Sequence, residues 1–332
     1  MYRNCSHLLL NYVIPQNAYS NIQSNIIFNV HYRFKSFKTI SKSLKFKENI
    51  NKNTLVQSNE QGTTTVIPNL TKPVIFTILF SSTSFIGATI WQYENMSHQI
   101  YGFKKDLMEG SFRQFCNTWW NSLSEGQKIF VPILVCNILV YIAWKIPSFR
   151  PIMMQYFISN SAKTLCLPMV LSTFSHNTGI HLAVNMFVLN SFIEHIVSNL
   201  GKEQFLAFYL SSGIFASLLS LVYRVCLREV TLSIGASGAI FGTLSYTCYK
   251  YPDMLLSIIF LPFLVFKAGI GIKIVMISDF MCLLLKFKLF DHAAHLGGAL
   301  FGLFWYVWGN ANIWQNRGPI LEWWHKRRNR PH

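Results

Sequence analysis

The sequence predicts an all-α polytopic membrane protein. Of its 332 residues, 51% are hydrophobic and only 13% are charged, and the mean hydropathy is +0.30. Several apolar runs approach or reach the roughly 20 residues that a helix needs to cross a bilayer. Short polar or basic stretches separate these runs. The chain therefore alternates between membrane-crossing segments and loops.

The formal net charge is +16, a value that in a soluble chain would suggest a nucleic-acid partner. Here the basic residues gather at the two ends and in short loops, where they set membrane topology. We therefore expect membrane lipid and no nucleic acid as a partner. The seven cysteines show no paired spacing, and most fall in or beside apolar segments, which is typical of small buried side chains.

The first 72 residues do not resemble a membrane core. Residues 1–47 contain seven Lys or Arg and no Asp or Glu, and they lack the compact apolar centre of a secretory signal. This composition predicts a mitochondrial presequence, with a merely basic disordered tail as the alternative. Residues 48–72 are polar and are expected to form a linker.

Seven apolar segments follow. Residues 73–91 form an extra helix that precedes the core, and residues 92–128 are expected to be a polar connecting segment. The core, residues 129–310, contains the other six, and residues 311–332 form a basic tail with tryptophans that suit a membrane surface. Seven crossings would put the two basic ends on opposite sides. One basic end would then violate the rule that basic residues remain on the side from which the protein inserts, unless the N-terminal end is removed or imported separately. The expected segments are 73–91, 129–144, 179–198, 205–222, 237–251, one between 261 and 285, and 293–308.

The fifth segment begins at Ser237. A helix over 237–251 is only about 21 to 22 Å long against roughly 30 Å of hydrocarbon. If its far end lies at one membrane face, its first turn lies below the other face, and Ser237 there sits beside unpaired backbone N–H groups. Such groups could hold an oxyanion. The alternative is a packing motif, because Gly238 and Gly242 are four residues apart.

A histidine in the last segment favours a catalytic role of Ser237 over a packing motif. His295 lies one turn into an apolar helix, where an imidazole needs a polar partner. Gly298 and Gly302 repeat the spacing of the glycines beside Ser237, so the two helices can approach closely. That approach is what a hydrogen bond between Ser237 and His295 requires.

Three more side chains are candidates for this site. His181 and Asn185 are four residues apart on one helix face, and both can donate to the oxygen of a tetrahedral intermediate. Their alternative role is a hydrogen bond between helices. Phe241 lies one turn after Ser237 and could stack on His295, or simply pack in the core.

Other chemistries fit less well. The nucleophile elbow of soluble hydrolases needs glycine two residues after the serine, where this chain has Ala239. A metal site could draw on four histidines, but no carboxylate or cysteine joins them at ligand spacing, so neither metal nor cofactor is expected. Asp291 suits a helix cap better than a third catalytic group, which favours a dyad. Lys267 and Asp279 receive no role. The four histidines are His176, His181, His292 and His295.

Together these motifs resemble the rhomboid family of intramembrane serine proteases. Further stretches at 173–176, 201–205, 259–262 and 290–295 resemble the mitochondrial, presenilin-associated rhomboid-like branch. The resemblance covers about Ile129 to the C-terminus. Its motifs are Gly235-Ala236-Ser237-Gly238, the run Ala294-His295-Leu296-Gly297-Gly298 with Gly302, and His181 with Asn185.

The resemblance implies a rhomboid six-helix core preceded by one extra transmembrane helix, a 1+6 arrangement. It implies a serine endopeptidase of the mitochondrial inner membrane that cleaves single-pass transmembrane proteins, with roles in membrane remodelling, mitophagy and apoptosis. The chain departs from the family in lacking a Trp-Arg pair between Lys145 and Lys163, and in having Phe241 where many relatives have tyrosine.

Two other classes of function remain to be distinguished. A non-proteolytic rhomboid-like protein that escorts membrane clients would typically lack the serine or the histidine, and this chain keeps both. A transporter would show charged groups in several spans and internal repeats, which the sequence does not.

Overall fold

A computed structural model of the protein describes residues 69–101, 111–162, 165–258, 261–287 and 290–329. These residues belong to one compact unit that extends from Ile67 to His332. The predicted presequence and nearly all of the predicted linker lie outside the described residues.

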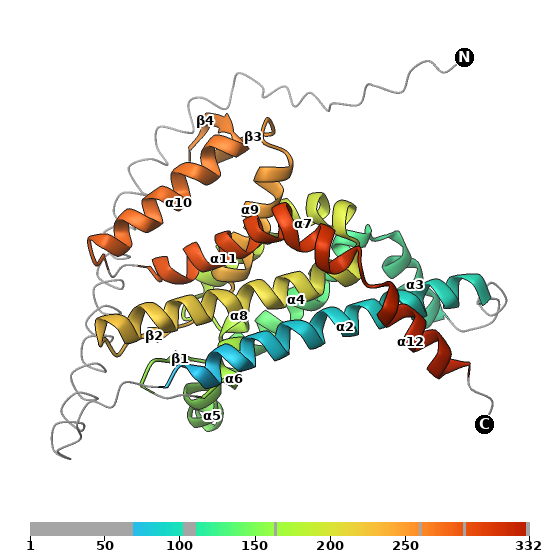
Figure 1. Ribbon diagram of the computed structural model, residues 1–332, viewed down its shortest axis with the longest axis horizontal. Helices are drawn as coiled ribbons and strands as arrows, with labels where there is room; N and C mark the ends of the chain where they lie inside the picture. Colours follow the sequence, from blue (N-terminus) through green and yellow to red (C-terminus); the bar gives the residue numbers. More distant parts are fainter. Residues whose placement is uncertain (1–68, 102–110, 163–164, 259–260, 288–289, 330–332) are drawn as a thin grey trace. The chain divides into compact units, whose positions relative to one another are not determined.

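The described part of the chain is mainly helical, which confirms the predicted fold class (Figure 1). Helices α2, α4, α7, α8, α9, α10 and α11 pack against one another in one bundle. In chain order the elements are α2 (Thr71–Tyr101), α3 (Ser111–Ser122), α4 (Glu125–Ala143), η2 (Pro147–Phe149), α5 (Arg150–Tyr156), β1 (Ser159–Asn160), α6 (Leu167–Leu171), η3 (Ser172–Phe174), α7 (Gly179–Leu200), α8 (Lys202–Leu227), β2 (Leu232–Ser233), α9 (Ser237–Lys250), β3 (Leu255–Ile258), β4 (Leu261–Lys267), α10 (Ala268–Leu284), α11 (His292–Phe304), the π-helix η4 (Trp305–Trp314) and α12 (Gly318–Arg328).

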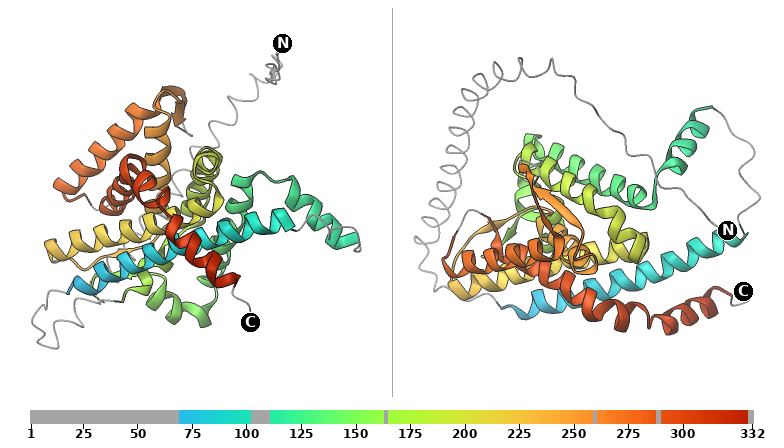
Figure 2. Two further views of the ribbon diagram at one scale, coloured as in Figure 1. Left: turned by 45° about the vertical axis from the view of Figure 1, so that its right-hand side comes forward. Right: turned by 90° about the horizontal axis from the view of Figure 1, so that it is seen from above.

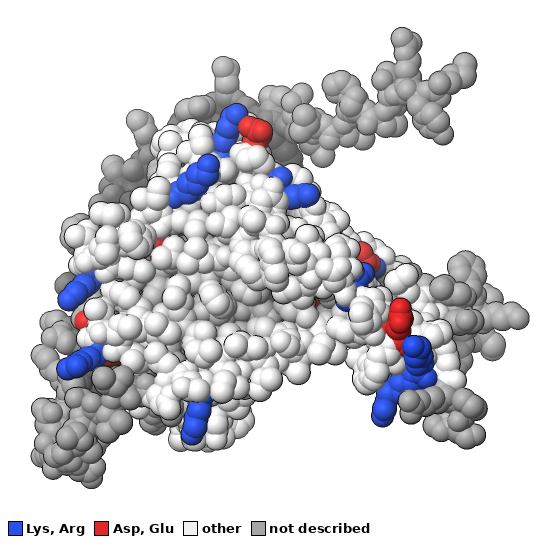
Figure 3. Space-filling model, viewed as in Figure 1, with Lys and Arg blue, Asp and Glu red and all other residues white. Residues whose placement is uncertain are grey.

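The outer surface suits a lipid environment. Within the described part of the chain, four helices, α2, α4, α7 and α8, are long and apolar enough to cross a membrane. Large apolar side chains stand exposed on the outer helices, as at Leu79 of α2 and Ile274 of α10. On the face drawn in Figure 3, most charged side chains lie toward the edges, and a broad uncharged area separates them. This distribution is expected where a bilayer covers the middle of a helix bundle.

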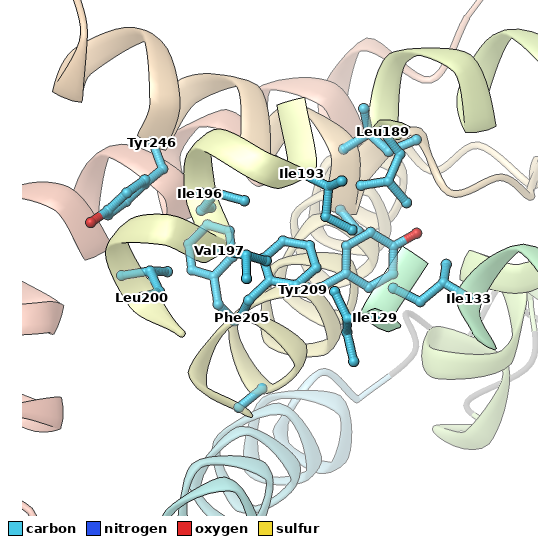
Figure 4. Packing of buried hydrophobic residues seen from close by; sticks show 14 of the residues in the cluster. Ile129, Ile133, Leu189, Ile193, Ile196, Val197, Leu200, Phe205, Tyr209 and Tyr246 are labelled. Carbon is cyan, nitrogen blue, oxygen red and sulfur yellow. The ribbon is translucent and has the colours of Figure 1, made fainter. Parts of the chain in front are cut away.

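The core forms around α8, the most deeply buried of the four long helices. Phe205, Phe208 and Tyr209 of this helix are fully buried. Figure 4 shows the rings of Phe205 and Tyr209 among aliphatic side chains of α4 and α7, including Ile129 and Ile193. Because α8 touches α2, α7, α9 and α11, it holds the other helices in fixed positions.

The extra N-terminal helix packs along α8 (Figures 1 and 2). Phe85 of α2 stacks on Trp305, with ring centroids 4.2 Å apart. The helix extends ten residues beyond the predicted end at residue 91, to Tyr101. At its polar end, Asn95 donates to a carboxylate oxygen of Glu203 at 2.6 Å.

The structure adds detail to two of the predicted segments. The described residues of the connecting segment 92–128 are largely helical, and α4 begins at Glu125 because Ser124 and Gln127 form a capping box. Within the range 261–285 predicted for the sixth segment, α10 begins at Ala268, because the residues before it form the antiparallel hairpin of β3 and β4, which pairs Leu255 with Lys267. Short apolar runs rich in Leu, Val and Phe suit a strand as well as a helix, so hydropathy alone did not separate them.

Candidate active site

Ser237 is the first residue of α9, directly after a constrained turn. Gly235 has a φ of +131°, a conformation that L side chains rarely adopt, and its N–H donates to the carbonyl of Ser172 at 3.0 Å. The helix has 14 residues, about 21 Å, so it is shorter than the hydrocarbon layer. The turn therefore places a serine at a helix N-terminus within the bundle.

His295 of α11 faces this serine. Its Nε2 lies 3.0 Å from Ser237 Oγ, a hydrogen-bonding distance. The imidazole of His295 is also stacked on the ring of Phe241, with centroids 4.2 Å apart and planes inclined by 7°. The ring of Phe241 thus limits the rotation of the imidazole.

Glycines allow α9 and α11 to come this close. A Cβ added to Gly298 would lie 1.9 Å from the carbonyl oxygen of Gly238. One added to Gly302 would lie 2.2 Å from the carbonyl oxygen of Gly242. Both distances are far shorter than any van der Waals contact, so the two backbones touch at two successive turns.

His181 and Asn185 lie on α7, which packs beside the turn at Gly235. A Cβ on Gly235 would meet the His181 ring at 2.9 Å, so this imidazole lies against the residues that precede Ser237. The Asn185 amide donates to the carbonyl of His181 at 2.9 Å, which leaves its second N–H for another acceptor.

A further histidine supports this wall of the site. His176 is 1% exposed, its ring packs edge-on against His181 at 5.0 Å, and its Nε2 accepts from the Ala236 N–H at 3.5 Å. Burial, followed by the nearby His181, lowers the pKa of His176 to about 3. The imidazole therefore stays neutral near pH 7 and acts as a hydrogen-bond acceptor.

Asp279 of α10 is a member of the site that the sequence reasoning missed. One of its oxygens, Oδ1, lies 2.6 Å from His292 Nδ1 and 3.7 Å from His295 Nδ1. The expectation that no carboxylate joins the histidines was wrong, because the fold brings together ligand atoms of all three residues within 4.8 Å. The available signal was an ionisable residue inside an apolar segment.

Asp291 caps α11, as the sequence predicts. Its Oδ1 accepts from the Ala294 N–H at 3.1 Å. The carboxylate also pairs with Arg224 of α8 and accepts from the hydroxyls of Ser220 and Ser233. Burial by itself would raise the pKa of Asp291, but Arg224 and these donors outweigh it and hold the pKa below its usual range. The cluster ties the start of α11 to α8 and to the strand before Gly235.

Comparison with known proteins places this arrangement in a family. The rhomboid domain matches residues 164–310. Presenilin-associated rhomboid-like protein, mitochondrial, of Homo sapiens is 45% identical over 272 residues, which cover 78% of this chain and 72% of the relative. Presenilin-associated rhomboid-like protein A, mitochondrial, of Danio rerio is 40% identical over 290 residues, with 78% and 76% covered. Rhomboid protein 1, mitochondrial, of Saccharomyces cerevisiae is 30% identical over 185 residues, with 53% and 52% covered.

These similarities support an intramembrane protease-type role and a multi-pass location in a mitochondrial membrane. The chain belongs to the rhomboid family, in its presenilin-associated rhomboid-like branch.

Proposed function

We propose that the protein is a serine endopeptidase that cleaves transmembrane proteins with a Ser237–His295 dyad. The observation that carries this proposal is the 3.0 Å contact between Ser237 Oγ and His295 Nε2. Two polar side chains from distant parts of the chain meet inside an apolar bundle, where such groups are costly and usually functional.

In the proposed reaction, Ser237 Oγ attacks a peptide carbonyl carbon while His295 Nε2 takes the hydroxyl proton. The carbonyl oxygen becomes an oxyanion, which the Ser237 backbone N–H and the side chains of His181 and Asn185 stabilise. By analogy with soluble proteases, each donor contributes about 3 to 4 kcal/mol to the transition state. His295 then gives its proton to the leaving amine, and water hydrolyses the acyl-enzyme.

Asp279 extends this proposal. A carboxylate 3.7 Å from His295 Nδ1 favours the imidazole tautomer that carries its proton on Nδ1, which frees Nε2 to act as the base. Asp279 acts through His295 and makes no contact with the reacting atoms, so we class it as a positioning residue.

The substrates are proposed to be single-pass transmembrane proteins of the mitochondrial inner membrane. The support is family membership, together with relatives whose names place them in mitochondria. A helical substrate hides its carbonyls in hydrogen bonds, so it must unwind locally before Ser237 can attack. Roles in membrane remodelling, mitophagy and apoptosis follow from the family resemblance. A non-proteolytic escort of membrane clients is the competing proposal.

Activity of the purified protein on a transmembrane substrate tests the assignment. Ser237→Ala and His295→Ala should each abolish cleavage. Ser191→Ala is the matched control, because the Ser191 hydroxyl is exposed on α7 and donates to the carbonyl of Phe187. A fluorophosphonate probe should label the wild type and not Ser237→Ala. Normal cleavage by either dyad variant would remove that residue from the mechanism, and an inactive wild type would favour the escort role.

A further inference from the structure

The group formed by Asp279, His292 and His295 offers more than the proteolytic reaction uses. The proposed reaction needs only one carboxylate oxygen beside His295. The Oδ2 atom of Asp279 is buried in this group and has no hydrogen-bond partner among the described residues. Both Asp279 and His292 are buried, with side-chain exposures of 9% and 10%. An unsatisfied polar atom at this depth is costly and calls for an explanation.

The donor set is typical of a transition-metal site. Two imidazoles and one carboxylate suit Zn²⁺, Co²⁺ and similar ions, whereas Mg²⁺ and Ca²⁺ prefer oxygen ligands. His292 and His295 are three residues apart on α11, so both imidazoles can reach the same point beside α10. Tetrahedral coordination with three protein ligands leaves a fourth position for water.

The distances allow such an ion with a small adjustment. Zinc bonds of about 2.0 to 2.2 Å in a tetrahedron separate neighbouring ligand atoms by roughly 3.3 Å. The distance from His295 Nδ1 to Asp279 Oδ1 is 3.7 Å, close to this value. The hydrogen bond from His292 Nδ1 to Asp279 Oδ1 is 2.6 Å. The ion would take the position of the Nδ1 proton, which would move to Nε2 of the same imidazole, and would open this pair of atoms by roughly 0.7 Å.

We propose that Asp279, His292 and His295 form an inhibitory site for Zn²⁺ or a similar transition-metal ion. The metal binds Nδ1 of both imidazoles and a carboxylate oxygen of Asp279. The proton of each imidazole then sits on Nε2, so no net proton is released. His295 Nε2 now donates to Ser237 Oγ and can no longer accept its proton. The inhibitory consequence rests on the proposed protease function, whereas metal binding itself does not.

Binding is tested on the full-length Ser237→Ala protein, with any affinity tag removed and accessible cysteines alkylated. Co²⁺ is the probe, because its visible absorption reports tetrahedral coordination. We expect one Co²⁺ per chain, displaced by Zn²⁺ and unaffected by Mg²⁺. Asp279→Asn and His292→Asn should each lose the band, while His195→Asn, which changes an exposed histidine of α7, should keep it. Circular dichroism checks that every variant is folded.

Inhibition is tested on the active enzyme. Zn²⁺ should lower cleavage by at least about tenfold, since general-base catalysis contributes about 10²–10⁴-fold, and a chelator should restore it. In His292→Asn, zinc should have little effect relative to the activity of that variant without metal. An absent band, a band that persists in folded Asp279→Asn and His292→Asn, or a bound ion that leaves cleavage unchanged would overturn the proposal. An enzyme inactive at every metal concentration counts instead against the protease function, and the Co²⁺ spectrum then decides the site.

Discussion

Asp279 gives the first prediction at the scale of single residues. Its carboxylate lies 3.7 Å from His295 Nδ1, too far for a direct hydrogen bond but close enough to favour one tautomer. Asp279→Asn should therefore lower kcat more than it raises KM. The expected loss lies between about tenfold and the ~10⁴-fold known where a triad carboxylate is directly bonded.

Rescue by a conservative variant separates positioning from folding at this residue. Glutamate keeps a carboxylate that can select the His295 tautomer, whereas asparagine does not. Asp279→Glu should recover part of the activity. An Asp279→Asn variant with wild-type kcat would exclude Asp279 from the proposed reaction.

The sequence predicted the contact between Ser237 and His295 but missed Asp279, and each outcome has a physical reason. A lone imidazole in an apolar helix demands a partner, and matched glycine spacings indicated which helix would provide it. Asp279 lies on α10, whose start the apolar run obscured, so the face it presents to α11 was not defined. Its pairing with His292 depends on how α10 packs against α11. The spacing of residues in the sequence does not indicate this packing.

At the scale of elements, the contact between α9 and α11 predicts a strong effect of one added methyl group. In Gly298→Ala the new Cβ would lie 1.9 Å from the Gly238 carbonyl oxygen, so the helices must separate. Overpacking of this kind costs about 1 to 3 kcal/mol. The separation also lengthens the contact between Ser237 and His295, so we expect cleavage to fall further than thermal stability. Both are measured on the purified protein.

Gly87→Ala in α2 is the matched control. A Cβ at Gly87 meets no heavy atom within 4 Å, so the change removes a flexible residue from a helix without a clash. Its stability should rise by about 0.5 to 1 kcal/mol, with cleavage unchanged. Equal thermal stability and equal cleavage in the two alanine variants would contradict a backbone contact between α9 and α11.

The Asp291 cluster joins α8, α11 and the strand before Gly235, and it predicts acid sensitivity. The pKa of Asp291 is lower in the folded protein than the value of about 3.9 in an unfolded chain. The stabilisation is therefore complete above roughly pH 4 and is lost as the pH falls through the folded-state pKa.

Asp291→Asn leaves Arg224 without its counter-charge and should destabilise the protein by about 3 kcal/mol near pH 7. Its Tm deficit relative to the wild type should shrink below about pH 4. Asp253→Asn is the control, since Asp253 pairs with Lys267 on the exposed surface and should leave Tm unchanged. A deficit in Asp291→Asn that stays constant with pH would refute this account.

At the scale of the whole described unit, the bundle fixes which of its ends share a membrane side. The polar end of α2 meets the start of α8 through the bond from Asn95 to Glu203, so α2 and α8 are antiparallel. The start of α2 and the end of α8 therefore lie together, on the side where Ser237 begins α9. Hydropathy alone could not show this, because it counts crossings without saying which ends meet.

This arrangement predicts opposite accessibility for two native cysteines. Cys226, at the end of α8, is exposed on the active-site side. Cys116, also exposed, lies on α3, which has only 12 residues, about 18 Å, and cannot cross before α4 begins. It must therefore lie on the opposite side, where α2 ends.

A membrane-impermeant maleimide tests this in mitoplasts and in inverted inner-membrane vesicles. Each preparation should label one of the two cysteines, and the labelled residue should switch between them. Cys116→Ser and Cys226→Ser assign the signals. Labelling of both cysteines in sealed mitoplasts would mean that α2 and α8 do not cross as antiparallel neighbours. Sealed mitoplasts expose only the outer face of the inner membrane to the reagent. Labelling of Cys226 in mitoplasts would therefore mean that the active site opens to this outer face, and labelling of Cys116 would mean that it opens to the inner face.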